Sequence, residues 1–348
     1  MQLQELGWDE SFADAFQPHE STGLAPARVA VEHRSEYVVY AEAGELRAEL
    51  SGRLRFDGDH PGVGDWVAIA SRADEGRATI QAVLPRRTAF VRKTAWAETK
   101  AQTVAANVDV VFIVCGLDLN FSLRRIERYL TLAWESGAQP VALLTKADLC
   151  EDVPARVFEV ETIAIGVPVH AVSVPTGEGI DEVRGYLGTG RTGALLGSSG
   201  VGKSTLVNAL VGEELLATRE VRAGDGRGRH TTSHRQLVLL PDGGLVLDTP
   251  GMRELQLWEA DEGVGAAFSD VDALLGQCRF SDCTHEREPG CAVRAALRSG
   301  ELDAERWESW RKLQRELEHL RVRQDGRLRS EARKERRRFA RSMRKTSY

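Results

Sequence analysis

The chain has 348 residues, of which 42% are hydrophobic and 28% charged, so it is long and apolar enough for two or three domains with separate cores. A net charge of −6 excludes a protein that binds nucleic acid through its overall charge, and five cysteines in this length exclude a disulfide scaffold. No run of about 18 apolar residues occurs and the N-terminus is acidic, so we expect neither a membrane span nor a signal peptide. These features predict a cytoplasmic protein.

The charge is unevenly distributed along the chain. Residues 321–348 contain 12 Lys or Arg and three Asp or Glu, a net charge of +9, so the other residues carry −15. A basic tail is therefore attached to an acidic body, a pattern typical of tails that interact with nucleic acid.

The first 90 residues divide into an N-terminal extension, 1–26, and an all-β segment, 27–90. The extension holds one short amphipathic helix around residues 10–16. The β segment alternates apolar and polar residues and is punctuated by Gly and Asp, with further strands at 64–70 and 78–86. This pattern predicts a small barrel of the OB type, and an SH3-like barrel is the alternative that periodicity leaves open.

Residues 91–255 have the pattern of an α/β domain. Apolar strands alternate with helical segments such as FSLRRIERYLTLAWESG and KSTLVNALVG. The strand segments are VDVVFIVCGL, PVALLTKAD, VPVHAVSV, TGALLGSSG and GGLVLDTPG. Because these strands are almost continuously apolar, we expect a parallel sheet that helices cover on both faces.

The remaining residues are predicted to be mostly helical. Residues 256–325 form a helical domain with one Cys/His cluster, and the basic tail occupies 326–348 at the end of a long charged helix.

The loop Thr145-Lys146-Ala147-Asp148 ends an apolar strand and matches the pattern [NT]-K-x-D. A carboxylate at Asp148 can accept hydrogen bonds from both N1–H and the 2-amino group of guanine, whereas adenine offers no such pair of donors. The aliphatic stem of Lys146 can lie over the base. We expect Ser173, at the end of the next strand, to lie on the base side as well.

A phosphate-binding loop follows in the chain. The residues that match G-x-x-x-x-G-K-[ST] lie between an apolar strand and an amphipathic helix; they are Gly197, Ser198, Ser199, Gly200, Val201, Gly202, Lys203 and Ser204, with Thr205 next in the helix. The glycines let backbone N–H groups converge on phosphate oxygens at a helix N-terminus. Lys203 should reach the β- and γ-phosphates, and Ser204 should ligate Mg²⁺.

Two further segments complete a nucleotide switch. Residues 224–236 are Gly-rich and polar, as a mobile switch loop requires, and Thr231 or Thr232 is a candidate Mg²⁺ ligand. Asp248 and Gly251 belong to a DxxG motif after an apolar strand. We expect Asp248 to hold Mg²⁺ through water and the Gly251 N–H to contact the γ-phosphate.

The guanine loop precedes the P-loop, which reverses the usual order in GTPases. A parallel sheet tolerates this change, because its old termini can be joined and a new cut made in a surface loop. The closing link falls around residues 188–192, and the cut follows Gly251.

A candidate metal site has the spacing C-x4-C-x-H-x5-C. Its ligands are Cys278, Cys283, His285 and Cys291. Three thiolates and one imidazole make a closed tetrahedral set, which is typical of one structural Zn²⁺ and not of a catalytic one.

The chain resembles one family, the ribosome small-subunit-dependent GTPase A family (RsgA, also called YjeQ), over about residues 27–325. The resemblance rests on the barrel, the TKAD loop ahead of GSSGVGKST, the GRHTT segment, DTPG and CRFSDCTHEREPGC. It implies an OB-fold, a circularly permuted GTPase domain and a C-terminal zinc domain. It also implies late maturation of the small ribosomal subunit, with GTP hydrolysis stimulated by that subunit.

The resemblance also bears on catalysis. The family lacks the water-orienting Gln after DxxG, and the position is Met252 here. The substitute that the family implies is the His of GRHTT, which is His230. Thr145 stands where Asn is common, and we expect this change to weaken one supporting hydrogen bond and leave Asp148 unaffected.

These features predict an assembly GTPase that binds GTP, Mg²⁺ and the small subunit as a monomer and is released on hydrolysis. The candidate rRNA contacts in or near the barrel are Trp66, Arg86, Arg87, Arg92 and Lys93. The basic tail would add contacts to phosphates.

Two other classes stay open at this point. A pure binding module would hold GTP without turnover, which Met252 favours when taken alone. A P-loop small-molecule kinase is disfavoured by the TKAD loop and by the lack of an evident lid.

Overall fold

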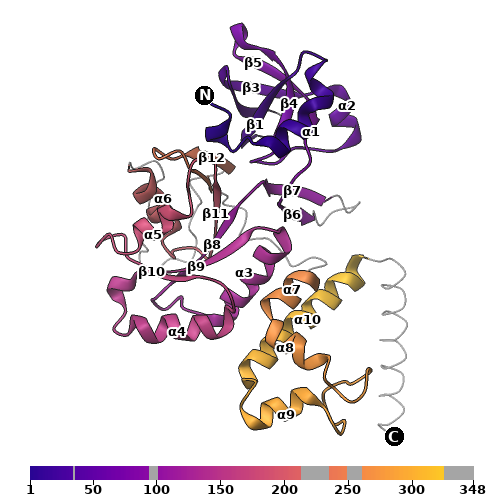
Figure 1. Ribbon diagram of the computed structural model, residues 1–348, viewed down its shortest axis with the longest axis vertical. Helices are drawn as coiled ribbons and strands as arrows, with labels where there is room; N and C mark the ends of the chain where they lie inside the picture. Colours follow the sequence, from indigo (N-terminus) through magenta and orange to yellow (C-terminus); the bar gives the residue numbers. More distant parts are fainter. Residues whose placement is uncertain (34–35, 94–100, 213–234, 249–260, 325–348) are drawn as a thin grey trace, which may run out of the picture. The chain divides into compact units, whose positions relative to one another are not determined.

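The computed structural model describes residues 1–33, 36–93, 101–212, 235–248 and 261–324. The chain divides into two compact units, one of residues 1–94 and 100–255 and the other of residues 95–99 and 256–348 (Figure 1).

The first unit begins with a closed five-stranded barrel. Its elements are β1 (Ala25–Glu32), β2 (Tyr37–Ala41), β3 (Gly44–Leu50), α2 (Gly52–Asp57), β4 (Trp66–Arg72), η2 (Ala73–Glu75) and β5 (Arg77–Val83). The strand order β1-β2-β3-β5-β4 closes through a β1–β4 pairing, and β3 and β5 run parallel. Alternate residues of β2 and β3 are buried, because every second side chain points into the barrel. The five-stranded closure confirms the OB-type prediction.

The N-terminal extension packs on the outside of this barrel. It forms η1 (Gln4–Leu6) and α1 (Glu10–Glu20), which is longer than the predicted helix. The ring centroid of Trp8 lies 4.7 Å from that of Trp66. Trp66 is therefore only 1% exposed, and its prediction as an RNA contact is wrong, because aromatic residues of the extension cover it.

The two predicted RNA-contact arginines of this region are engaged in contacts within the protein. Arg86 donates from Nε and Nη2 to the two oxygens of buried Asp65, both at 2.8 Å. Arg87 pairs with Asp9 at 2.6 Å and lies over the Phe12 ring. Arg86 thus holds a buried carboxylate within the barrel, and Arg87 joins the segment after β5 to the extension. Contact of these arginines with RNA stays a prediction.

A β-hairpin that the sequence did not reveal connects the barrel to the second part of this unit. It consists of β6 (Ala89–Lys93) and β7 (Ala101–Ala106). Gly64 of the barrel has φ +91°, and a Cβ there would lie 2.2 Å from the Ala106 carbonyl oxygen. Close backbone approach therefore requires glycine at this junction.

The second part is the predicted α/β domain, and its sheet has the order β10-β9-β8-β11-β13-β12. The strands are β8 (Val110–Gly116), β9 (Gln139–Thr145), β10 (Val169–Val172), β11 (Thr192–Leu196), β12 (Arg235–Leu239) and β13 (Leu245–Asp248). The helices are α3 (Leu123–Ser136), η3 (Ala147–Leu149), α4 (Val153–Ile163), α5 (Ile180–Gly185) and α6 (Lys203–Val211).

The prediction of a parallel sheet is confirmed for five of these strands and wrong for β12, which runs antiparallel to β13. Arg235 and Gln236, predicted to end the switch loop, belong to β12. The end of β1 also pairs with β12, so the barrel and the α/β sheet are continuous.

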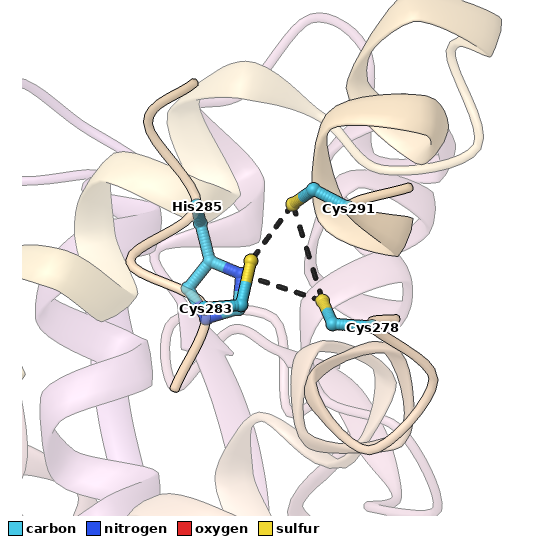
Figure 2. A group of neighbouring side chains, drawn as sticks. All are labelled: Cys278, Cys283, His285 and Cys291. Atoms are coloured by element: carbon cyan, nitrogen blue, oxygen red, sulfur yellow. Dashed lines mark hydrogen bonds between the residues drawn. The ribbon is translucent and has the colours of Figure 1, made fainter. Parts of the chain in front are cut away.

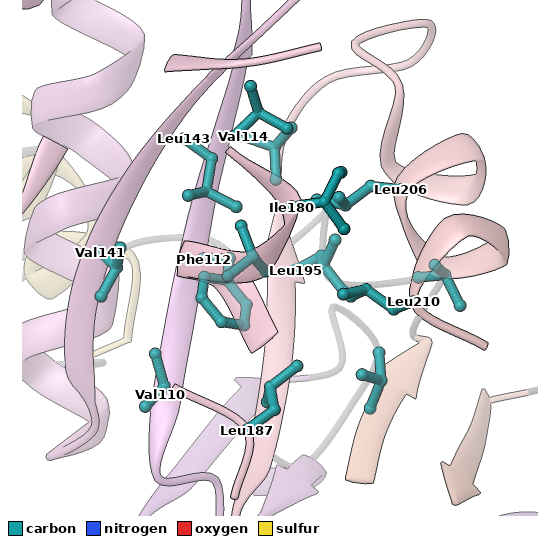
Figure 3. Packing of buried hydrophobic residues seen from close by; sticks show 14 of the residues in the cluster. Val110, Phe112, Val114, Val141, Leu143, Ile180, Leu187, Leu195, Leu206 and Leu210 are labelled. Atoms are coloured by element: carbon teal, nitrogen blue, oxygen red, sulfur yellow. The ribbon is translucent and has the colours of Figure 1, made fainter. Parts of the chain in front are cut away.

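Helices cover both faces of the parallel strands, as the apolar strands predicted. Every residue of β8 and β11 is buried. On one face, Phe112 and Leu195 pack against α5 and α6 through Ile180, Leu206 and Leu210 (Figure 3). On the other, α3 packs against β8 and β9, and α4 packs against α3 and β10.

The second unit is mostly α-helical, as predicted. Its helices are α7 (Asp261–Ala267), α8 (Ser269–Leu275), α9 (Ala292–Ser299) and α10 (Ala304–Gln324). Arg306 of α10 is 5% exposed and donates to Asp270 of α8 and to the Ala267 carbonyl. The basic tail, 326–348, lies outside the described residues. Among the described helices, none combines the length and the hydropathy that crossing a bilayer requires.

Candidate functional site

The predicted nucleotide-binding residues gather at one edge of the α/β sheet. Strands β8, β9, β10 and β11 are parallel neighbours, so their carboxyl ends lie at the same edge. Thr145 ends β9, Ser173 follows β10 and Gly197 follows β11. Ligands of open α/β sheets bind outside this edge.

The P-loop has the backbone that phosphate binding requires. A Cβ on Gly197 would lie 2.4 Å from the Val114 carbonyl oxygen, so the loop leaves β11 in close contact with β8. Gly200 and Gly202 have φ values of +78° and +96°. No side chain caps the N-terminus of α6, which leaves the N–H groups of its first turn able to bind an anion.

The side chains of the P-loop and of the first turn of α6 differ in their contacts and exposure. The Lys203 ammonium donates to the carbonyls of Gly197 and Ser198, both at 2.7 Å, so it lies over the loop. In the first turn of α6, Ser204 is half-buried and Thr205 is exposed, whereas Val201 is 1% exposed and anchors the loop in the core.

The guanine loop is oriented from the neighbouring strand. Ser173 is fully buried, and its hydroxyl donates to Asp148 Oδ1 at 2.7 Å. Asp148 itself is exposed, whereas Ala147 beside it is buried. Lys146 has a left-handed φ of +61°. The structure thus brings together the base-side residues that the sequence predicted separately.

Thr145 connects the guanine loop to the P-loop. Its hydroxyl lies 2.5 Å from the Val201 carbonyl oxygen and 3.3 Å from that of Cys115. We expected Thr in place of Asn to weaken a supporting hydrogen bond. The single hydroxyl nevertheless reaches the P-loop backbone, because Thr145 ends its strand directly beside that loop.

The switch residues are described only in part. Asp248 ends β13, and the backbone pairing of β13 with β11 puts it at the same edge of the sheet. His230, Thr231, Thr232 and Gly251 lie outside the described residues, as do the side chains of Arg92 and Lys93.

Two residues near this edge were not predicted. Asp118, in the loop after β8, forms an ion pair with Lys146 at 2.6 Å. Arg125, in α3, donates from Nη1 to Ser198 Oγ at 3.0 Å. Desolvation acts to raise the pKa of Asp118, but hydrogen bonds from the Lys146 ammonium and the Asn120 N–H lower this pKa below its ordinary value. Neither residue belongs to a motif, and the sequence signal for Asp118 is its place just after a buried strand, whereas Arg125 lies in the first turn of α3.

The four predicted metal ligands converge in the second unit. The ligand atoms of Cys278, Cys283, His285 and Cys291 all lie within 4.8 Å of one another (Figure 2). His285 Nδ1 lies 3.5 Å from the sulfurs of Cys278 and Cys291, which are 4.0 Å apart. Zn–S bonds of about 2.3 Å at tetrahedral angles separate two sulfurs by about 3.8 Å, so the donor set fits this ion.

The surroundings shift the pKa values of the cluster's ligands in different directions, since desolvation and the neighbouring thiols raise the pKa of Cys283 to about 11. Desolvation lowers the pKa of His285, which keeps the imidazole neutral and able to coordinate. Desolvation acts to raise the pKa of the Cys278 thiol, but hydrogen bonds from N–H groups of α9 lower this pKa below its ordinary value. Glu288 organises the connecting loop, accepting bonds from the Glu286 and Arg287 N–H groups, both at 3.0 Å.

Comparisons with known proteins agree with this geometry. The family model described as RsgA GTPase matches residues 83–258. A small ribosomal subunit biogenesis GTPase RsgA of Opitutus terrae is 50% identical over 91% of this chain and 90% of its own. The protein of the same name in Streptomyces coelicolor is 46% identical over 96% of this chain and 91% of its own.

Solved structures show the same fold. The crystal structure of YjeQ from Thermotoga maritima has a TM-score of 0.65 and 31% identity, covering 84% of this chain and 98% of that protein. YloQ, a circularly permuted GTPase, has a TM-score of 0.61 at 24% identity over 86% of this chain and 97% of its own.

Proposed function

The chain belongs to the RsgA GTPase family and is a GTP hydrolase, and from this premise we propose that it acts late in maturation of the small ribosomal subunit. In this proposal it binds the subunit and its rRNA in the GTP state, is stimulated by the subunit and leaves when GTP is hydrolysed. The names of its relatives support the place of action, since they are small ribosomal subunit biogenesis GTPases.

The observation that carries the proposal is the joining of the base loop to the phosphate loop. The hydroxyl of Ser173 orients the Asp148 carboxylate, and the Thr145 hydroxyl contacts the P-loop at Val201. A guanine held by Asp148 would thus have its phosphates directed at the N-terminus of α6.

The proposed contacts to GTP follow from donor and acceptor chemistry. Asp148 accepts from N1–H and the 2-amino group of guanine, and the stem of Lys146 lies over the base. The proposed phosphate site comprises the backbone of Gly197, Ser198, Ser199, Gly200, Val201 and Gly202 with Lys203, Ser204 and Thr205. The proposed Mg²⁺ ligands are Ser204, Thr232 and Asp248, and the Gly251 N–H contacts the γ-phosphate.

We assign orientation of the attacking water to His230. Met252, after the DxxG motif, has no hydrogen-bonding group that can hold water. His230 is the nearest imidazole to the switch threonines in sequence. In the proposal the small subunit orders the loop around this residue.

We assign one structural Zn²⁺ to the Cys/His cluster. Four protein ligands leave no open position for substrate, so this ion would stabilise the fold of the second unit. The basic tail would contribute salt-dependent phosphate contacts, while the acidic body would be repelled from other RNA surfaces. We expect the protein to work in the cytoplasm as a monomer.

Sedimentation with purified small subunits tests the release step. We expect the full chain to sediment with the subunits in the presence of a non-hydrolysable GTP analogue and to stay in the supernatant with GDP. Equal retention in the two nucleotide states would contradict release on hydrolysis.

The catalytic assignment is tested with two histidines of the same segment. We expect His230→Ala to bind GTP normally and to lose stimulated turnover, whereas the matched control His234→Ala should keep it. Full stimulated activity of His230→Ala would remove that residue from the mechanism.

A further inference from the structure

We propose that the loop after β8 and the first turns of α3 position both nucleotide loops, with Asp118 fixing Lys146 and Arg125 fixing Ser198. This inference rests on the proposed nucleotide site and adds two positioning residues that no motif of the chain contains.

The topology explains why this loop reaches both sites. Strand β8 lies between β9, which leads into the guanine loop, and β11, which leads into the P-loop. Its exit is tied to β9 by a hydrogen bond of 2.8 Å from the Leu117 N–H to the Thr145 carbonyl. Side chains that follow β8 therefore lie between the base side and the phosphate side of the sheet edge.

The contact on the base side is an ion pair between Lys146 and Asp118. Lys146 Nζ lies 2.6 Å from Asp118 Oδ2, and the two side chains are only 26% and 24% exposed. The other oxygen of Asp118 accepts the Asn120 N–H at 2.8 Å, which fixes the carboxylate. A free lysine side chain loses conformational entropy when it is ordered. With its ammonium already anchored, Lys146 loses less when a base binds on its stem.

The contact on the phosphate side uses the second residue of the P-loop. Arg125 Nη1 donates to Ser198 Oγ at 3.0 Å, and a longer bond of 3.4 Å joins it to the Asn120 carbonyl. Arg125 and Ser198 are both half-buried. The guanidinium thus braces the P-loop and adds positive charge beside it.

The two contacts meet at one residue. Asn120 donates its N–H to Asp118 and accepts from Arg125 through its carbonyl. A continuous series of contacts therefore runs from Lys146 through Asp118, Asn120 and Arg125 to Ser198. Its function is to hold the two loops at the separation that base and phosphates require.

The base-side test measures the affinity of the full chain for a fluorescent GDP. We expect Asp118→Ala to weaken binding about tenfold, because Lys146 must then be ordered at binding. Asp118→Glu should restore most of the loss. The matched control is Asp181→Ala, which removes a carboxylate whose side chain is 92% exposed.

A double-mutant cycle separates positioning from general destabilisation. In the Lys146→Ala background, Asp118→Ala should weaken GDP binding no further, since its partner is gone. Additive losses, or an unchanged affinity in the single variant, would overturn the role of Asp118.

The phosphate-side test compares GDP with guanosine. Arg125→Ala should weaken GDP several-fold and leave guanosine affinity unchanged, and Arg125→Lys should recover part of the loss. Arg124→Ala is the matched control, because Arg124 is the exposed neighbour in the same helix. An equal loss for both ligands, or no loss for GDP, would overturn this assignment.

Different outcomes would contradict the positioning role and the proposed function. A wild-type chain that does not prefer GDP to ADP contradicts the guanine site itself. A wild-type chain that prefers GDP and is stimulated by small subunits, beside an Asp118→Ala variant of equal affinity, contradicts only the positioning role.

Discussion

At the scale of single residues, Asp148 is the side chain to which we assign the choice of base. Its carboxylate is oriented by buried Ser173, which in turn is fixed by its position at the end of β10. Both motif residues could be read from the sequence, because each follows an apolar strand. Their contact could not, since 25 residues separate them along the chain.

Asp148→Asn is expected to change the preferred nucleotide. The amide presents one donor and one acceptor, which match the C2 carbonyl and the N1–H of xanthine, and guanine offers two donors instead. We expect GTP affinity to fall about 100-fold or more and XTP binding to appear. Competition binding with GTP and XTP measures this, and unchanged discrimination would show that Asp148 does not contact the base.

Arg28 holds together the junction within the first unit, where three segments of the chain meet. It is fully buried and donates to the carbonyls of Leu6 in the extension, Gly64 in the barrel and Asn107 directly after β7. Burial is the main cause that lowers the pKa of Arg28 to about 10, so it stays charged at pH 7.

Arg28→Met is expected to loosen this junction. Each buried carbonyl that loses its donor costs about 1–3 kcal/mol, partly offset by removing a buried charge. We expect a lower urea midpoint and faster hydrogen exchange in residues 1–20. Arg77→Met, on the exposed side of β5, is the control, and equal behaviour of the two variants would contradict this role.

At the scale of elements, the sequence predicted those whose signal is local. The strands β8, β9 and β11 are almost continuously apolar because both faces are covered, and α6 follows a motif. The β6–β7 hairpin and β12 were missed. Strand β12 pairs with β1 across the junction, and β6 and β7 form a two-stranded sheet of their own, so neither belongs to the run of parallel strands that the pattern revealed.

The error at Trp66 has the same origin. A tryptophan among arginines is typical of an RNA-binding face, but the extension supplies Trp8 and Phe12 to cover it. Sequence patterns reveal which residues are apolar and not which distant segment buries them.

Metal removal is expected to act on one unit alone. Chelation, or Cys278→Ala, should remove one Zn²⁺ per chain and increase hydrogen exchange in residues 261–324, because these ligands link α8 to α9. GDP binding by the first unit should persist. Elemental analysis of Cys150→Ala, a cysteine outside the cluster, provides the control; equal zinc content in Cys278→Ala would contradict the site.

At the scale of the whole molecule, the permuted order has a direct consequence. The DxxG motif at 248–251 lies a few residues before the second unit, which resumes at residue 256. We propose that the state of the nucleotide is passed along this short connection to the helical unit. Charge supports a directed encounter with RNA, since the tail carries +9 and the body −15.

We propose that small ribosomal subunits stimulate GTP hydrolysis by this chain. The most direct measurement is the rate of GTP turnover by the full chain with and without saturating purified small subunits, with Lys203→Ala as the inactive control. We predict a rise of at least about tenfold in the wild type and none in the control, as for GTPases whose active site is completed by a partner. An equal rate with and without subunits would contradict stimulation by the small subunit.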